Sequence, residues 1–287
     1  MNGKGLNRNM KHFIEKLKES IRSILEVCVL ISAFFIPPIF NASKWIGMCF
    51  AKNNLNFDNI KYYFLLCVGN WGTGFALMII VLFKFRAFNK EKLFNTKNVY
   101  HDYCYTWYWF CAKILGYKKC NMKLVPIFMQ FKLALNDTFE KYYVGTEDDY
   151  LIKEKEQIDI KKLNCNPVSD EINLVLVDTY PILENQLPEN KKSLSTIVIS
   201  RNKNDFNRYF SQAFITKIVN EVRKLPSNVN YINIYATTNP KHTFKIVRNA
   251  FKLAERGNIN KLIVFQQKKD GARKFSSKGM VIYNNRV

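Results

Sequence analysis

The chain of 287 residues is 48% hydrophobic and 15% aromatic, which is enough apolar material for a folded core and excludes a wholly disordered protein. Its 44 lysines and arginines outnumber 23 aspartates and glutamates, which gives a formal net charge of +21. The expected partners are therefore anionic: nucleic acid, lipid headgroups or a phosphorylated ligand. The seven cysteines are scattered and lack the short paired spacing of zinc sites, so we expect reduced thiols and no metal.

Residues 1–23 predict a basic amphipathic segment that leads into a membrane. Six lysines and arginines recur along it, while Ile14, Leu17 and Ile21 repeat at helical spacing on the other side. A helix with one basic and one apolar face suits the anionic surface of a lipid bilayer.

Residues 24–86 predict two transmembrane helices. The first apolar run covers 24–40, and its Pro37-Pro38 pair should kink or end the helix. The second run covers 62–85 and carries no charge before Lys84, which is about the length that a bilayer core requires. The alternatives are buried helices of a soluble protein, or a secretory signal peptide for the first run.

The distribution of basic residues predicts how these helices are oriented. Six lysines and arginines precede the first span and four follow the second, whereas the loop between the spans has only Lys44, Lys52 and Lys61. Because basic residues concentrate on the cytoplasmic side, both termini are expected in the cytoplasm and the protein in the inner (plasma) membrane.

Small and polar residues form a stripe within the second span, at Gly69, Asn70, Gly72, Thr73 and Gly74. Such a stripe permits close packing against another helix, and it can also line a hydrated path. The sequence pattern leaves both interpretations open.

Residues 87–287 predict a cytosolic α/β domain. A helix or strand–helix pair is expected at 123–143, followed by a charged surface segment or hairpin that extends to about residue 170. Apolar alternation and helical spacing then predict strands at 172–177, 196–200, 231–236, 261–266 and 279–283, with helices at about 205–225 and 240–256.

Two strand-to-helix turns in this domain carry the candidate ligand-binding residues. Hydroxyl, amide and cationic groups at the carboxyl edge of an open α/β sheet can receive phosphate oxygens together with the free N–H groups of the helix. The candidates are Ser200, Arg201, Asn202 and Lys203 in the first turn, and Thr237, Thr238, Asn239 and Lys241 in the second. The alternative is two capped helices without a ligand, which explains the hydroxyls and amides but not the cations.

The sequence shows no catalytic constellation. The three histidines are far apart in the chain, and the GxSxG, P-loop, HExxH, GxGxxG and CxxC motifs are absent. Asp178 at a strand end is the best lone candidate for a catalytic carboxylate, with turn capping as the alternative. His242 in the first turn of a helix is expected either at the surface or against a phosphate. We therefore expect a binding protein that uses no cofactor, not an enzyme.

The order of segments STIVIS, INIYATTNP, IVFQQ and GMVIY, with helices between them, resembles the SAVED domain over residues 160–287. That CARF-related domain senses cyclic oligonucleotides in bacterial anti-phage systems of the CBASS type, and some members join it to two N-terminal transmembrane helices. The resemblance implies a Rossmann-like, CARF/SAVED-like fold in which Ser200 and the turn 237–240 lie at the pocket, with Gln266 at the next strand end.

These observations lead to one preferred function and two alternatives. The preferred function is a membrane effector whose cytosolic domain binds a cyclic nucleotide or oligonucleotide and which forms a homo-oligomer that disrupts the membrane in antiviral defence. The first alternative is a membrane-tethered nucleic-acid-binding protein of a mobile element, favoured by the net charge and the basic stretch 268–278. The second is an enzyme that uses Asp178.

Overall fold

The computed structural model describes residues 3–50, 60–145, 151–152, 156–165, 167–201, 209–252, 259–268 and 271–285. The chain divides into two compact units. We call residues 1–99 and 106–119 the helical unit, and residues 100–105 and 120–287 the α/β unit. The predicted order, two apolar helices followed by an α/β domain, is confirmed.

The helical unit contains two segments, Ile21–Ile39 and Ile60–Asn89, that are long and apolar enough to cross a membrane, with mean hydropathies of 1.7 and 2.0. Pro37 and Pro38 occupy the last turn of the first helix, which ends one residue later, as expected from their missing N–H groups. The elements of this unit are α1 (Gly3–Ile39), α2 (Ala42–Phe50), α3 (Ile60–Asn89), β1 (Leu93–Phe94) and α4 (Tyr105–Lys113).

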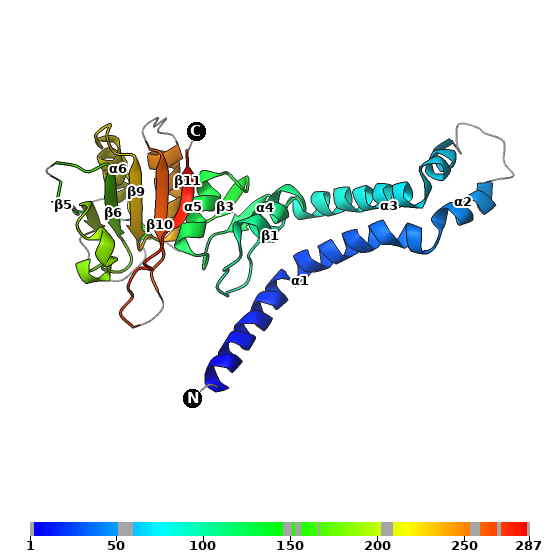
Figure 1. The fold of residues 1–287 in the computed structure, drawn as a ribbon, viewed down its shortest axis with the longest axis horizontal. Coiled ribbons are helices and arrows are strands. Elements are labelled where there is room, and N and C mark those ends of the chain that lie inside the picture. The colour runs from blue at the N-terminus through cyan, green and yellow to red at the C-terminus, as the bar shows by residue number, and fades with distance from the viewer. Residues whose placement is uncertain are drawn as a thin grey trace. The chain divides into compact units, whose positions relative to one another are not determined.

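Helices α1 and α3 pack side by side in opposite directions (Figure 1). At Gly74 the approach is so close that an added Cβ would lie 2.1 Å from the carbonyl oxygen of Phe34. The close packing expected of the small-residue stripe is therefore present at this position. At Gly69 the backbone has a φ of +70°, which breaks α3 into two helical stretches.

The α/β unit is built on a six-stranded sheet in the order β11-β10-β9-β6-β7-β5. Neighbouring strands among β10, β9, β6 and β7 are parallel, while β11 and β5 join the two edges antiparallel. The strands are β5 (Ile158–Leu163), β6 (Glu171–Val177), β7 (Ser195–Arg201), β9 (Tyr231–Ala236), β10 (Lys261–Phe265) and β11 (Met280–Asn284).

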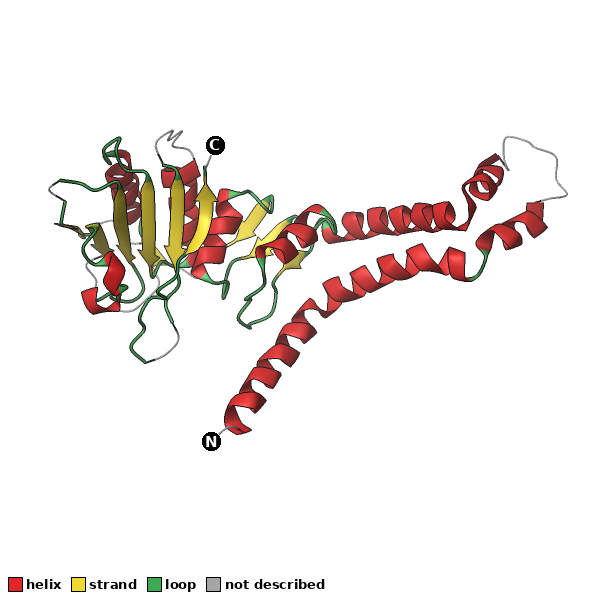
Figure 2. Cartoon of the chain, in the orientation of Figure 1, coloured by secondary structure: helices red, strands yellow, loops and turns green. Residues whose placement is uncertain are grey.

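Shorter elements surround this sheet (Figure 2). The helices are α5 (Ile127–Leu135), α6 (Gln212–Arg223), α7 (Pro240–Ile246) with a π-helical continuation η3 (Val247–Lys252), and the 3-10 turns η1 (Glu184–Gln186) and η2 (Glu189–Lys191). The short strands are β2 (Lys119–Asn121), β3 (Lys141–Tyr143), and the parallel pair β4 (Leu151–Ile152) and β8 (Tyr209–Phe210).

The two faces of the large sheet are covered differently. Buried residues such as Leu174, Ile234 and Val264 face α5, α6 and α7, which lie behind the sheet in Figure 2. The opposite face is covered by Leu187 and Phe275, which come from the η1–η2 segment and the β10–β11 loop. Among the described residues, no α-helix contributes to the core on that second face.

The strands expected from the sequence are found within one or two residues of their predicted ends, but two elements differ. Helix α6 begins at Gln212, not near 205, because the Ser211 hydroxyl caps it by accepting a hydrogen bond from the N–H of Phe214. Strand β5 lies in the segment expected to be a surface excursion. Its charged residues Asp159 and Lys161 mask the strand pattern, as is common at a sheet edge.

Substituting Gly74 with alanine is predicted to loosen the α1–α3 pair. Because the added methyl group meets backbone, not a flexible side chain, the two helices must separate, at a cost of about 1–3 kcal/mol. Thermal unfolding of the detergent-solubilised protein, followed by tryptophan fluorescence, should show a lower Tm. The matched control is Gly47→Ala in α2, where the new Cβ lies 3.8 Å from Leu66, an ordinary contact. An unchanged Tm for Gly74→Ala would contradict the packing described.

Candidate functional site

The carboxyl ends of β6, β7 and β9 lie side by side and bring the two predicted turns to one edge of the sheet. The strands are in parallel register, with Val177 opposite Ser200 and Leu176 opposite Ala236. Directly after these strands come Asp178 and Thr237, while Arg201 ends β7. The spatial convergence expected of an open α/β sheet is therefore present.

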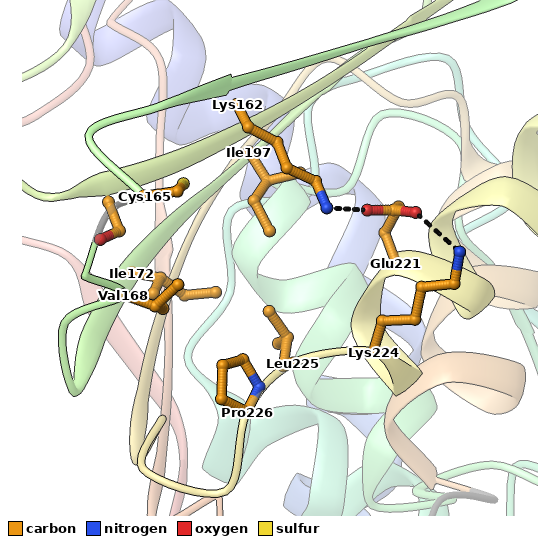
Figure 3. A pocket seen from close by; sticks show the side chains of 10 residues that line it. Lys162, Cys165, Val168, Ile172, Ile197, Glu221, Lys224, Leu225 and Pro226 are labelled. Carbon is orange, nitrogen blue, oxygen red and sulfur yellow. Dashed lines mark ion pairs between the residues drawn. The ribbon is translucent and has the colours of Figure 1, made fainter.

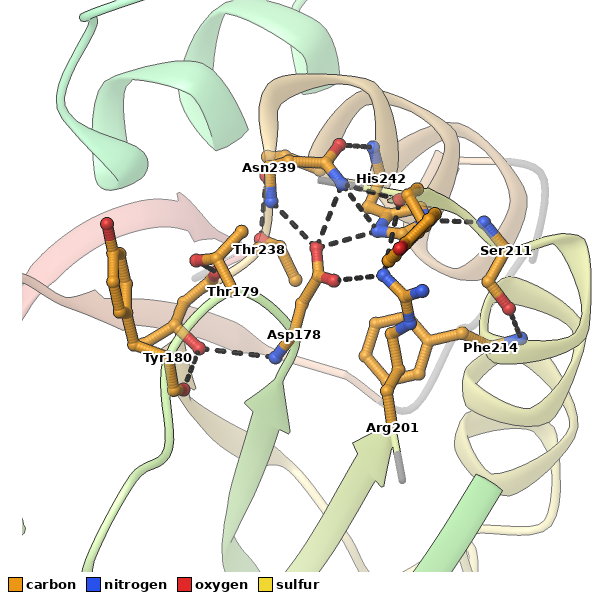
Figure 4. A network of polar contacts seen from close by, with 12 residues as sticks. Asp178, Thr179, Tyr180, Arg201, Ser211, Phe214, Thr238, Asn239 and His242 are labelled. Carbon is orange, nitrogen blue, oxygen red and sulfur yellow. Dashed lines mark hydrogen bonds and ion pairs between the residues drawn. The ribbon is translucent and has the colours of Figure 1, made fainter. Parts of the chain in front are cut away.

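Asp178 lies at the centre of this edge and its side chain is fully buried. One carboxylate oxygen accepts from Nη1 of Arg201 at 2.6 Å, and the other accepts from Nδ1 of His242 at 2.7 Å and from the backbone N of Asn239 at 2.9 Å (Figure 4). Burial disfavours the ionised carboxylate, but the hydrogen bonds from His242 and Asn239 and the charge of Arg201 outweigh it. The pKa of Asp178 is therefore lower than usual.

Arg201 has no exposed side-chain surface and is held between two carboxylates. Its Nε contacts both oxygens of Glu156, at 2.9 and 3.0 Å, and its Nη1 reaches Asp178 and the carbonyl of Tyr209. We expected Arg201 to present its charge to a ligand phosphate. In this structure two buried carboxylates already pair with the guanidinium, so its charge is directed into the protein.

His242 is completely buried, so the prediction of a surface position is wrong. Its Nε2 accepts a hydrogen bond from the backbone N of Ser211 at 2.9 Å, which requires that nitrogen to be unprotonated. The proton then lies on Nδ1 and is donated to Asp178, and the imidazole is neutral. The rings of Phe210 and Phe214 pack around it.

The turn after β9 caps helix α7 in the way that its composition predicts. The side chain of Asn239 accepts from the N–H of His242, and Pro240 follows at the first helical position. The hydroxyl of Thr237 donates to the carbonyl of Tyr180 at 2.8 Å, and that of Thr238 pairs with the hydroxyl of Thr243 at 2.7 Å. These groups are buried and bonded to the protein itself.

The remaining candidates are more accessible. Ser200 and Lys241 are half-buried, and the Lys241 ammonium lies 4.6 Å from the ring centroid of Phe210. Gln266 is half-buried too, and its Oε1 accepts from the backbone N of Ile127. Asn202 and Lys203 lie outside the described residues.

The sequence analysis missed Glu156 and Ser211 as members of this network. Glu156 lies 45 positions before Arg201 in a stretch rich in both charges, and nothing local distinguishes it from a solvated carboxylate. Ser211 acts through its backbone N–H, for which residue type carries no signal. Three-dimensional pairing alone identifies both residues.

A separate cavity of about 160 Å³ opens at the amino ends of β6 and β7 (Figure 3). Ile172, Ile197 and Leu225 supply apolar walls, and Glu221 sits between Lys162 at 2.8 Å and Lys224 at 3.7 Å. The hydrogen bond from Lys162 lowers the pKa of Glu221. The cavity is smaller than the 300–1,000 Å³ typical of ligand sites, and its polar groups pair with each other.

Replacing Asp178 with asparagine is predicted to destabilise the protein by about 3–5 kcal/mol, because the substitution breaks a buried ion pair. The folded-state pKa of Asp178 lies below its unfolded value, so its carboxylate stabilises the fold above about pH 4. That contribution is lost as the pH falls through the folded-state pKa. Denaturant unfolding of the full chain in detergent between pH 3 and pH 7 measures both effects.

The control is Glu189→Gln, since the Glu189 side chain is 84% exposed and its pair with Lys192 lies at the surface. Its stability should stay close to that of the wild type. If the Asp178→Asn variant is as stable as the control at pH 7, the buried network does not stabilise the carboxyl edge of the sheet.

The match to a family model agrees with this architecture. Residues 7–282 match the family described as the SMODS- and Ubiquitin system-associated 2TM effector domain, SUa-2TM. The chain is also similar to an Acinetobacter baumannii Cap4 SAVED/CARF-domain containing receptor with the cyclic trinucleotide 2′3′3′-cAAA. The identity is 10% and the TM-score 0.42, over 62% of this chain and 41% of that chain.

A second structure of the Acinetobacter baumannii receptor, with 3′3′3′-cAAA, gives 9% identity and a TM-score of 0.36, over 61% of this chain and 40% of that chain. The chain thus spans about two fifths of the length of these receptors, and the likeness is distant. A search of curated proteins finds no match. The family match covers nearly the whole sequence, both apolar helices and the α/β unit included, and the chain therefore belongs to the SUa-2TM family of two-transmembrane effector domains.

Proposed function

We propose that this protein is a membrane effector whose α/β unit binds a cyclic nucleotide or oligonucleotide and whose two apolar helices then breach the bilayer. One observation carries the proposal: one family model of effector domains matches residues 7–282, which join the two candidate spans to a mostly parallel α/β sheet. The net charge of +21 and the SAVED-like order of segments in the sequence support a phosphorylated ligand.

A buried polar cluster supports a role for the spans in the response. Glu26, only 6% exposed and within the first candidate span, accepts from Nε of Arg22 at 3.1 Å, from Nδ2 of Asn89 at 2.8 Å and from the hydroxyl of Tyr117 at 3.2 Å. We call these four residues the Glu26 cluster. Charged groups within membrane helices are costly and tend to be functional.

The Glu26 cluster joins three parts of the helical unit: α1, the end of α3 and the segment after α4. The chain enters the α/β unit only three residues beyond Tyr117, at Cys120. We propose that ligand binding opens the cluster and frees α1 from α3. Two spans are too few to enclose an aqueous path, so the active state is a homo-oligomer. In this oligomer the exposed apolar residues Phe64, Trp71 and Phe83 contact lipid or the same residues of neighbouring copies.

The basic flanks of the spans support a plasma-membrane protein with both termini in the cytoplasm. In that orientation the α/β unit meets a nucleotide made inside the cell. Protease protection of the α/β unit in right-side-out cell-derived vesicles, and its cleavage in inverted vesicles, is the expected pattern.

The central test is dye release from vesicles that contain the purified full-length protein. Cyclic di- and trinucleotides of adenylate and guanylate are added one at a time. At least one of these compounds is predicted to cause dye release. The corresponding linear nucleotides and protein-free vesicles are the controls. Correctly inserted protein that releases no dye with any member of the panel would argue against the proposal.

Substituting Glu26 with leucine is predicted to raise ligand-independent dye release several-fold, because Arg22, Asn89 and Tyr117 lose their shared acceptor. Tyr117→Phe removes a single hydroxyl group and should change release in the same direction by less. The matched control is Glu91→Gln, whose side chain is 73% exposed in its pair with Lys119. Wild-type release from both cluster variants would rule out this role for the cluster.

Nucleic-acid binding is a second candidate function, favoured by exposed cations of the β10–β11 loop such as Lys268, Arg273 and Lys278. A mobility shift with duplex DNA whose affinity falls steeply between 50 and 200 mM salt would support it.

A further inference from the structure

We propose that one nucleotide unit of the ligand enters a cavity on the second face of the large sheet, to whose core no described α-helix contributes, an inference that rests on the proposed function. The cavity has a volume of about 360 Å³ and lies between the η1–η2 segment and the β10–β11 loop. We call it the loop cavity. Its lining includes Asn185, Leu187, Asn190, Lys268, Lys274 and Phe275.

The frame of the loop cavity is fixed by hydrogen bonds between its two walls. The backbone N of Phe275 donates to the carbonyl of Gln186 at 2.9 Å, and Nε2 of Gln186 donates to the carbonyl of Ala272 at 3.2 Å. Across the base of the β10–β11 loop, the N–H of Lys268 donates to the carbonyl of Lys274 at 2.9 Å. These hydrogen bonds fix the two walls relative to each other, as expected of a site that is formed before its ligand binds.

The floor of the cavity is apolar. Leu187 and Phe275, 7% and 3% exposed, pack on the second face of the sheet together with Tyr235 and Phe265. The rings of Tyr235 and Phe265 stack with centroids 4.6 Å apart, and Phe275 meets Tyr235 edge-on at 5.1 Å. An apolar floor beside asparagine side chains suits a nucleobase, which has an apolar face and a hydrogen-bonding edge.

The charge of the rim favours phosphate. Lys268 and Lys274 are exposed, and in the described part of the chain no carboxylate forms an ion pair with either of them. Glu189, a carboxylate of the same rim, accepts a hydrogen bond from Lys192 at 2.6 Å. This bond, with a smaller contribution from the charge of Lys274, lowers the pKa of Glu189. Unlike the buried and already neutralised Arg201, these two lysines can supply charge to a ligand.

The same loop is connected to the polar network at the carboxyl edge. The guanidinium of Arg273 lies 4.6 Å from the ring centroid of Tyr180, and the carbonyl of Tyr180 accepts from the hydroxyl of Thr237. A ligand that draws Lys274 inward therefore acts on a loop that contacts Tyr180. Tyr180 lies two residues after Asp178 in the chain. The volume fits one nucleotide unit, and the rest of a cyclic oligonucleotide extends beyond the cavity.

Direct binding to the full-length protein in detergent tests this assignment, with fluorescently labelled cyclic di- and trinucleotides of adenylate and guanylate as probes. The double variant Lys268→Glu, Lys274→Glu should weaken binding at least tenfold. Ser277→Trp, which fills the lined space without changing charge, should weaken it comparably. The charge-matched control is Lys217→Glu, Lys245→Glu, two exposed lysines on α6 and α7 that are predicted to leave the affinity within twofold.

Loss of binding in both cavity variants, with the control unchanged, supports the site. Wild-type affinity in either cavity variant overturns the site and leaves the proposed function standing. A wild-type protein that binds none of the probes, while its thermal unfolding shows that it is folded, overturns both. Equal weakening in the cavity variants and the control also overturns the site, because it indicates a diffuse effect of net charge.

Discussion

The ionised carboxylate of Asp178 joins three segments of the α/β unit that are remote in sequence. Burying such a group costs several kcal/mol unless it is paired and hydrogen-bonded, so the end of β7 and the first turn of α7 must be in place together. The neutral ring of His242 accepts a hydrogen bond from the backbone N of Ser211. The start of α6 must therefore be in place as well. The edge that an anionic ligand was expected to use is thus a structural junction. Its arginine is accordingly withdrawn from solvent, whereas Lys268, Lys274 and Lys278 of the β10–β11 loop are exposed.

The helical unit repeats this arrangement around Glu26, with a different consequence. In the α/β unit a buried carboxylate fixes one edge of a sheet that a large apolar core already holds together. In a membrane, apolar contacts distinguish poorly between a neighbouring helix and lipid, so polar contacts carry more of the specificity of helix association. The hydrogen bond from Asn89 to Glu26 therefore contributes to which face of α1 meets α3. Contacts of this kind are suited to a two-state element, because water can replace them once the helices part.

Sequence periodicity was sufficient for the order of elements and for the capped turn at Asn239, since strand alternation, helical spacing and N-capping are local properties. It failed for β5, whose polar residues are those of a protected sheet edge. It also failed for His242, which is buried, and it did not indicate the buried ion pairs of Arg201. Whether a polar side chain points to solvent or into the protein depends on a partner such as Glu156, whose position is set by the folded chain. The exposed cavity on the second face gave no sequence signal, because its walls come from two loops.

The left-handed glycine in α3 bears on the membranes that this protein can occupy. As one straight helix, the 30 residues of α3 would measure about 45 Å, well beyond a hydrocarbon core of roughly 30 Å. The break at Gly69 divides this length, and the stretch that follows it, up to Asn89, is about 30 Å long and spans the core alone. The ten residues before and including the break can follow another direction, with Leu66 beside Gly47 of α2. A change of direction at this one residue is a way to accommodate hydrophobic mismatch without tilting the part of α3 that packs on α1.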